Sequence, residues 1–112
     1  MKVDRSESVA VFEQVAGEIR RAILDGEARP GERLPPAKDL AAELGVNTNT
    51  VLRALRVLRE EGLLEFRRGR GVSVSGTPER AAVLEKAREL MEISRIHGYR
   101  REEVLRLVES LP

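Results

Sequence analysis

The sequence contains no cysteine and no tryptophan, and His97 is its single histidine. Without cysteine there is no disulfide framework and no thiol chemistry. With one histidine, neither a metal-ligand cluster nor a nucleophile–base pair can be assembled. Acidic pairs such as Glu60-Glu61 and Glu102-Glu103 fit solvated helix faces better than acid–base catalysis. The sequence therefore predicts that the protein is not an enzyme and has no catalytic residue, metal site or cofactor.

Long hydrophobic runs are also missing, and no apolar stretch is long enough to span a membrane. The first ten residues, MKVDRSESVA, lack the apolar core of a signal peptide. Cytoplasmic residence, with no membrane partner, is the resulting expectation.

The sequence also lacks an excess of one charge, because it has 20 basic and 19 acidic residues and a net charge of only +1. The distribution is more informative than the total. Six arginines lie between Arg53 and Arg70, against three glutamates in the same segment. Such a basic segment can bind phosphates while the rest of the surface stays neutral.

A helix, a tight turn and a second helix are predicted in the middle of the chain. Apolar residues at helical spacing predict a short helix over 38–44, and Gly45 follows where helices commonly end in a left-handed conformation. Asn47 is a good N-cap for a second helix over about 47–61, ended by Gly62. Pro36 fits the first turn of the shorter helix.

Two short strands should follow, over 63–67 and 72–75, joined by a tip rich in arginine and glycine. Arg33-Leu34 can pair as a very short strand beside them. A helix, turn, helix and β-hairpin in this order form a winged helix-turn-helix, whose second helix enters the DNA major groove. The predicted fold is mainly α with a small β wing (α+β).

The second helix should place its polar residues on the face opposite Val51, Leu55 and Leu58. Asparagine pairs with adenine, arginine with guanine, and threonine offers a hydroxyl and a methyl group. For Asn47, capping is the first role, and DNA contact is a second. The side chains expected to contact DNA are Thr48, Asn49, Thr50 and Arg53.

In these residues the chain resembles the GntR-type transcriptional regulators, and its short length resembles their YtrA-like branch. The matching segments are VFEQVAGEIRRAILDGEARPGERLPPAKDLAAELGVNTNTVLRALRVLREEGLL and the wing RRGRGVSV. The resemblance implies a homodimeric DNA-binding repressor. It also implies DNA contacts at Lys38, at 47–50 and Arg53, and at the wing residues Arg67, Arg68, Gly69, Arg70 and Gly71. The sequence departs from the family at Pro36, where a serine is usual, and at Thr48, where this branch often has proline.

Amphipathic helices flank this module on both sides. One is predicted from about Val9 or Val11 to Leu24, and the boundary to a second segment lies at Gly76. Thr77-Pro78-Glu79 is a strong helix start. A last helix follows Gly98, with Arg100 where a good N-cap would be expected.

The division predicted is a winged helix-turn-helix domain over 1–76 and a two-helix dimerisation segment over 77–112. This segment has seven basic and seven acidic residues, so it offers no electrostatic attraction to DNA. Two amphipathic helices bury their apolar faces better against the same pair of a second chain. The residues expected in that interface are Leu84, Leu90, Met91, Val104 and Leu107.

The predicted function is a sequence-specific DNA-binding transcriptional regulator, a repressor that binds an inverted-repeat operator as a homodimer. The recognition helix (about 47–61) and the wing (about 63–75) would contact the double-stranded DNA. The alternative is a winged-helix module that binds another protein. The short second segment leaves little room for an enclosed effector pocket. A small-molecule effector is possible at the dimer interface, but nothing in the sequence indicates one.

Overall fold

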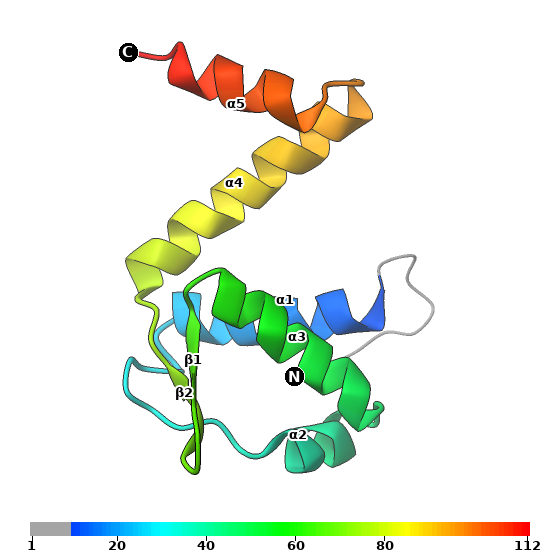
Figure 1. Ribbon diagram of the computed structural model, residues 1–112, viewed down its shortest axis with the longest axis vertical. Coiled ribbons are helices and arrows are strands. Elements are labelled where there is room, and N and C mark those ends of the chain that lie inside the picture. The colour runs from blue at the N-terminus through cyan, green and yellow to red at the C-terminus, as the bar shows by residue number, and fades with distance from the viewer. Residues whose placement is uncertain (1–9) are drawn as a thin grey trace. The chain divides into compact units, whose positions relative to one another are not determined.

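The computed structural model describes residues 10–112, which form five helices and one two-stranded antiparallel sheet (Figure 1). This confirms the predicted mainly α fold with a small β wing. In chain order the elements are α1 (Val11–Leu24), α2 (Ala37–Leu44), α3 (Thr48–Glu60), β1 (Leu64–Arg67), β2 (Gly71–Val74), α4 (Pro78–Ile96) and α5 (Arg101–Glu109). A helix start at Val9 lies outside the described residues. The contacts between residues group the chain into two compact units, and the boundary between the units lies between Ala81 and Ala82 within α4.

The core of the first unit lies where α1 and α2 pack against α3. Its apolar side chains recur at three- and four-residue steps, so each helix buries one stripe and leaves the opposite face to solvent. The most buried of them on the three helices are Val15, Ala16, Ile19, Ile23, Leu40, Ala41, Val51, Ala54, Leu55 and Leu58. The amphipathic stripe predicted for the first helix is confirmed.

A buried ion pair joins α1 to the end of α3. The Arg20 guanidinium donates to both carboxylate oxygens of Glu61, with Nε–Oε1 at 2.9 Å and Nη2–Oε2 at 3.1 Å. The two side chains are only 11% and 13% exposed. The expectation that the Glu60-Glu61 pair lies on a solvated face is therefore wrong for Glu61.

The turn between α2 and α3 has the predicted geometry. Gly45 ends α2 in the left-handed conformation, with φ at 68°, which an L side chain rarely adopts. Asn47 then caps α3, and its Oδ1 accepts a hydrogen bond of 2.8 Å from the Asn49 N–H. Pro36 is the N-cap of α2 and not its first residue, so the helix has no side-chain cap, and the Pro36 carbonyl accepts the first helical hydrogen bond from Leu40 N at 3.0 Å.

Replacement of Asn47 by alanine should lower the free energy of unfolding by about 1 kcal/mol, because the first turn of α3 loses its side-chain cap. Asn47→Ser should retain most of that stability, since a serine hydroxyl accepts the same bond. Urea unfolding followed by circular dichroism measures both changes. Equal stability of Asn47→Ala and the wild type would contradict the capping role.

The wing is a hairpin in which Leu64 pairs with Val74 and Arg67 pairs with Gly71. The first strand begins one residue later than predicted and ends at the predicted residue, and the second strand begins and ends one residue earlier than predicted. Gly69 and Gly71 have φ near 75°, which permits the tight reversal at the tip. The segment 31–34 extends the hairpin as a third short edge: Gly31 N donates to Val74 O at 2.7 Å, and an isolated bridge joins Arg33 to Ser73. The short strand predicted at Arg33-Leu34 is confirmed.

The start of α4 is fixed to the end of α3. Thr77 Oγ1 accepts from Arg80 N at 3.2 Å, as expected of a threonine cap. The Arg80 side chain donates from Nε to the Glu61 carbonyl at 2.8 Å. Gly76 is required nearby, because a Cβ there would lie 2.9 Å from the Leu63 Cα.

The second unit contains the rest of α4 and α5. Ion pairs at i,i+3 spacing line the exposed face of α4, and the Arg95 guanidinium hydrogen-bonded to Glu92 lowers the pKa of that carboxyl. The start of α5 is capped from inside the helix, since the Glu103 carboxylate accepts from Arg100 N at 2.8 Å. Glu103 thus compensates for the poor N-cap at Arg100. No helix within residues 10–112 is long and apolar enough to cross a membrane.

Candidate nucleic-acid interface

The first turn of α3 presents polar side chains to solvent. Asn47, Thr48 and Asn49 are exposed, and Thr50 is half-buried. The inward stripe of the helix fixes this orientation, because Val51 and Leu55 are fully covered on the opposite face. These amide and hydroxyl groups can hydrogen-bond to base edges in the major groove.

Arg53 lies one turn further along α3 and is also exposed. Its guanidinium carbon lies 3.8 Å from the centroid of the Phe12 ring on α1. The sequence predicted the outward position of Arg53 but not this contact.

Lys38 is the second residue of α2, and its side chain is exposed. Its ammonium group can therefore meet a phosphate on the DNA backbone.

The wing tip carries three exposed arginines, at Arg67, Arg68 and Arg70. Arg67 also pairs with Glu65 on the same strand, so part of its charge is balanced. Arg68 and Arg70 flank Gly69, where the absence of a side chain allows the backbone to approach a ligand closely. This arrangement is suited to phosphates and to a narrow minor groove.

A groove of about 930 Å³ lies between the wing and the two helices of the helix-turn-helix. Its apolar walls come from α3 and the wing strands, and its arginines come from the wing and from the segment before α2. In Figure 1 the hairpin tip and α2 lie toward the same end of the first unit. The residues that line the groove include Arg33, Leu34, Pro36, Leu52, Leu55, Phe66, Arg67, Arg68 and Val72. The structure thus brings the wing arginines next to the recognition helix, in a groove that a sugar–phosphate strand could enter.

Arg33 is a candidate DNA contact that sequence reasoning missed. It is exposed, lines this groove, and also lines a second groove of about 640 Å³ with Arg67 and Arg70. A Cβ at Gly71 would lie 3.4 Å from the Arg33 Nε, so the guanidinium is close to the wing tip. The predicted strand pairing at Arg33 was the one available indication, because it places this side chain beside the hairpin.

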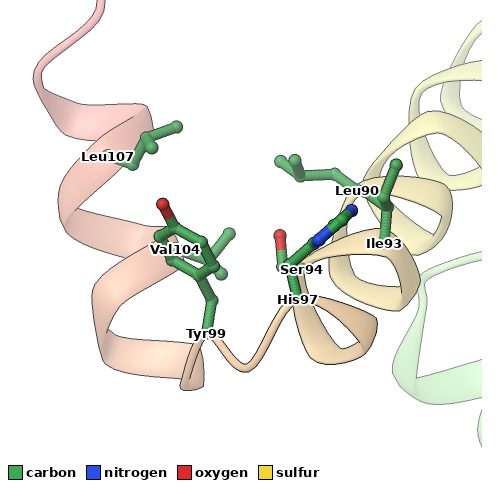
Figure 2. A pocket seen from close by; sticks show the side chains of 7 residues that line it. All are labelled: Leu90, Ile93, Ser94, His97, Tyr99, Val104 and Leu107. Atoms are coloured by element: carbon green, nitrogen blue, oxygen red, sulfur yellow. The ribbon is translucent and has the colours of Figure 1, made fainter.

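The second unit contains a separate apolar groove of about 500 Å³. Figure 2 shows Leu90 of α4 and Leu107 of α5 pointing toward each other across it. Ile93, Leu90 and Leu107 remain 54%, 36% and 45% exposed. Val104 is only 3% exposed, so it packs within the unit and has almost no surface left for a partner. Leu84 and Met91 are half-buried.

Within residues 10–112 no three histidine, aspartate or glutamate side chains are grouped so that they could hold a metal ion.

The exposed polar turn, the arginine-rich wing and the groove beside the wing are the features of a DNA-binding winged helix. The family model described as bacterial regulatory proteins, gntR family, matches residues 12–74. The chain belongs to the GntR family. This assignment confirms the resemblance seen in the sequence, and it makes the chain a DNA-binding transcriptional regulator.

Two relatives of this GntR-family chain illustrate the match. The HTH-type transcriptional regulator Rv1152 of Mycobacterium tuberculosis is 32% identical over 113 residues, which cover 100% of this chain and 93% of that protein. The HTH-type transcriptional repressor YtrA of Bacillus subtilis is 35% identical over 75 residues, covering 67% of this chain and 58% of that protein. The names of both relatives describe transcriptional regulators and not enzymes.

Solved structures support the same fold. YtrA from Sulfolobus acidocaldarius, a GntR-family transcription factor, superposes with a TM-score of 0.65 at 26% identity, over 97% of this chain and 93% of that one. AraR(DBD) in complex with operator ORE1 has a TM-score of 0.59 at 27% identity, over 65% of this chain and 89% of that one.

Proposed function

We propose that this GntR-family regulator is a repressor that binds an inverted-repeat operator as a homodimer. The recognition helix would contact bases in the major groove, and the wing would contact the backbone of the same half-site. The observation that carries the proposal is the exposed polar first turn of α3, together with the exposed wing residues Arg67 and Arg68, which share a groove with Leu52 of the same helix. The repressor role is supported by the name of the Bacillus subtilis relative, YtrA.

In the proposed complex the contacts divide by chemistry. Thr48, Asn49, Thr50 and Arg53 would contact base edges, with Asn47 in a second role besides its cap. Basic side chains would neutralise the DNA phosphates. The basic residues expected from the sequence are Lys38, Arg67, Arg68 and Arg70, and the structure adds Arg33. Gly69 and Gly71 would let the wing backbone approach the DNA.

In the proposal, residues 77–112 form the dimer interface and residues 1–76 form the DNA-binding part. The groove between α4 and α5 leaves Leu90, Ile93 and Leu107 partly exposed, an arrangement that a second copy of the same helices could cover. The segment carries equal numbers of basic and acidic residues, so repulsion between two copies would be small. A two-fold dimer would match the symmetry of an inverted repeat, with recognition helices about 34 Å apart.

Arg53→Ala should weaken operator binding by about 1–3 kcal/mol and relax the preference at particular base pairs, because a guanidinium that contacts a base discriminates among bases. Arg68→Ala should instead weaken binding to all sequences and reduce the salt dependence by about one unit of slope, since each phosphate contact releases about one counterion. Fluorescence anisotropy titrations at several salt concentrations distinguish the two. An unchanged sequence preference in Arg53→Ala would show that the recognition face is misplaced.

Selection of bound sequences from a random duplex pool tests the function as a whole. An enriched inverted repeat would support the proposal, and a mobility-shift comparison with a scrambled duplex would measure the specificity. If no duplex is retained at physiological salt, the module binds another kind of partner, and a protein-interaction role replaces DNA binding.

A further inference from the structure

The contact between Arg53 and Phe12 joins the recognition helix to a residue outside the helix-turn-helix. Phe12 lies in the first turn of α1, and Arg53 lies in the second turn of α3. The guanidinium carbon is 3.8 Å from the ring centroid, which is stacking distance for a cation over an aromatic face. Phe12 is half-buried and Arg53 is exposed, and the guanidinium lies over the face of the Phe12 ring.

We propose that Phe12 is a positioning residue for Arg53, which it holds ready to contact a base. The inference rests on the proposed function, in which Arg53 contacts the DNA. Helix α1 would then contribute to sequence specificity as well as to the core.

The chemistry of the guanidinium allows both contacts at once. Its five N–H donors lie in the plane of the group, and stacking uses only one face of that plane. The donor edge therefore stays available for two parallel hydrogen bonds to guanine O6 and N7. Because an arginine side chain has many rotamers, a free one must be ordered when DNA binds. Stacking on Phe12 orders it beforehand, so the side chain loses less entropy in the complex.

The ring can do this only if α1 is fixed relative to α3, and two features fix it. Val15, Ala16 and Ile19 on α1 are at most 1% exposed, and α1 packs against α3 along this face. Near the C-terminal ends of the two helices, the Arg20–Glu61 pair forms a further link. Phe12 is therefore held by a packed helix.

A second stacked arginine shows what distinguishes the Phe12 contact. The Arg59 guanidinium carbon lies 4.6 Å from the centroid of the Phe66 ring on β1. Arg59 is in the last turn of α3, away from the polar first turn. The Phe12 contact is the one that orders an arginine on the DNA-contacting half of the helix.

The test compares the full chain with Phe12→Leu, Phe12→Tyr, Arg53→Ala and the Phe12→Leu/Arg53→Ala double variant. Each is titrated against the selected operator and against operators changed at the base pair whose preference Arg53→Ala relaxes. Phe12→Leu keeps an apolar side chain but removes the ring, so it should reduce discrimination at that base pair about two- to five-fold. Phe12→Tyr keeps the ring and should discriminate as the wild type does. The double variant should discriminate no worse than Arg53→Ala alone.

A purely structural role for Phe12 predicts a different pattern. Phe12→Leu would then weaken binding to all operators by the same factor, and its effect would multiply with that of Arg53→Ala. Either result would overturn the inference. Thermal unfolding of each variant identifies any that is not folded at the assay temperature, and Phe12→Met, which is unbranched and lacks a ring, then replaces Phe12→Leu.

Failure of the inference and failure of the proposed function give distinct results. If the wild type retains no duplex, both the proposed function and the positioning role of Phe12 are wrong. If it binds a specific operator but Arg53→Ala leaves every base preference unchanged, DNA binding stands and the positioning role of Phe12 is overturned.

Discussion

Leu90→Asp should convert the 112-residue chain from the proposed dimer to a monomer at micromolar concentration and weaken operator binding by about 10²–10⁴-fold. Leu90 lines the apolar groove between α4 and α5, where a carboxylate would have to be buried without a partner or the interface abandoned. A monomer engages one half-site at a time. It therefore loses the second contact, which a dimer makes at an effective concentration of about millimolar.

Sedimentation velocity and operator titration of the same samples measure the two effects. Ile96→Asp is the matched control, because Ile96 is on the same helix and more exposed, at 65%, but does not line the groove. It should leave both the oligomeric state and the operator affinity nearly unchanged. A wild-type monomer, or a Leu90→Asp variant that still dimerises, would contradict the proposed interface.

Arg20→Met should lower the free energy of unfolding by about 3 kcal/mol, the low end of the range for a broken buried ion pair. The substitution keeps an apolar stem but leaves the Glu61 carboxylate, with its side chain 13% exposed, without its guanidinium. Burial of that charge is unfavourable, and α1 also loses its link to the end of α3. Urea unfolding followed by circular dichroism gives the change directly.

A control variant and a double variant test whether the buried charge causes this loss of stability. Arg95→Met removes an ion pair of the same chemistry from the exposed face of α4, and it should leave the unfolding midpoint almost unchanged. Arg20→Met combined with Glu61→Gln should recover part of the loss, because the amide carries no charge to bury. If Arg20→Met and Arg95→Met shift the midpoint equally, the Arg20–Glu61 pair is not an important part of the fold.

Local patterns were sufficient to predict most of the fold. The three- and four-residue spacing along α1, α2 and α3 predicted which faces are buried, and Gly45 and Asn47 predicted the ends of two helices. These features depend on residues close together in the chain, for which spacing and backbone conformation are known rules. The cap at α5 was missed because Glu103 acts back on Arg100 and replaces the expected side chain.

Contacts between distant residues could not be predicted in the same way. Arg20 and Glu61, or Phe12 and Arg53, are far apart in sequence, and no periodicity relates one partner to the other. Their contact depends on how α1 packs across α3, which only the folded chain specifies. The place of Arg33 at the wing likewise follows from its pairing with β2, so that its side chain comes near the tip only after the hairpin has formed.

The separation of inward and outward residues on α3 has a consequence for how such a regulator changes over generations. Thr48 and Asn49 point away from Val51, Ala54 and Leu55, which are at most 1% exposed and form the core. In the proposed complex, substitutions at the outward positions would alter which operator is bound while the core stays intact. A lineage could then acquire new target genes through these two positions without first losing a folded protein. Changes at Asn47, which also caps the helix, carry a penalty in stability and should be rarer.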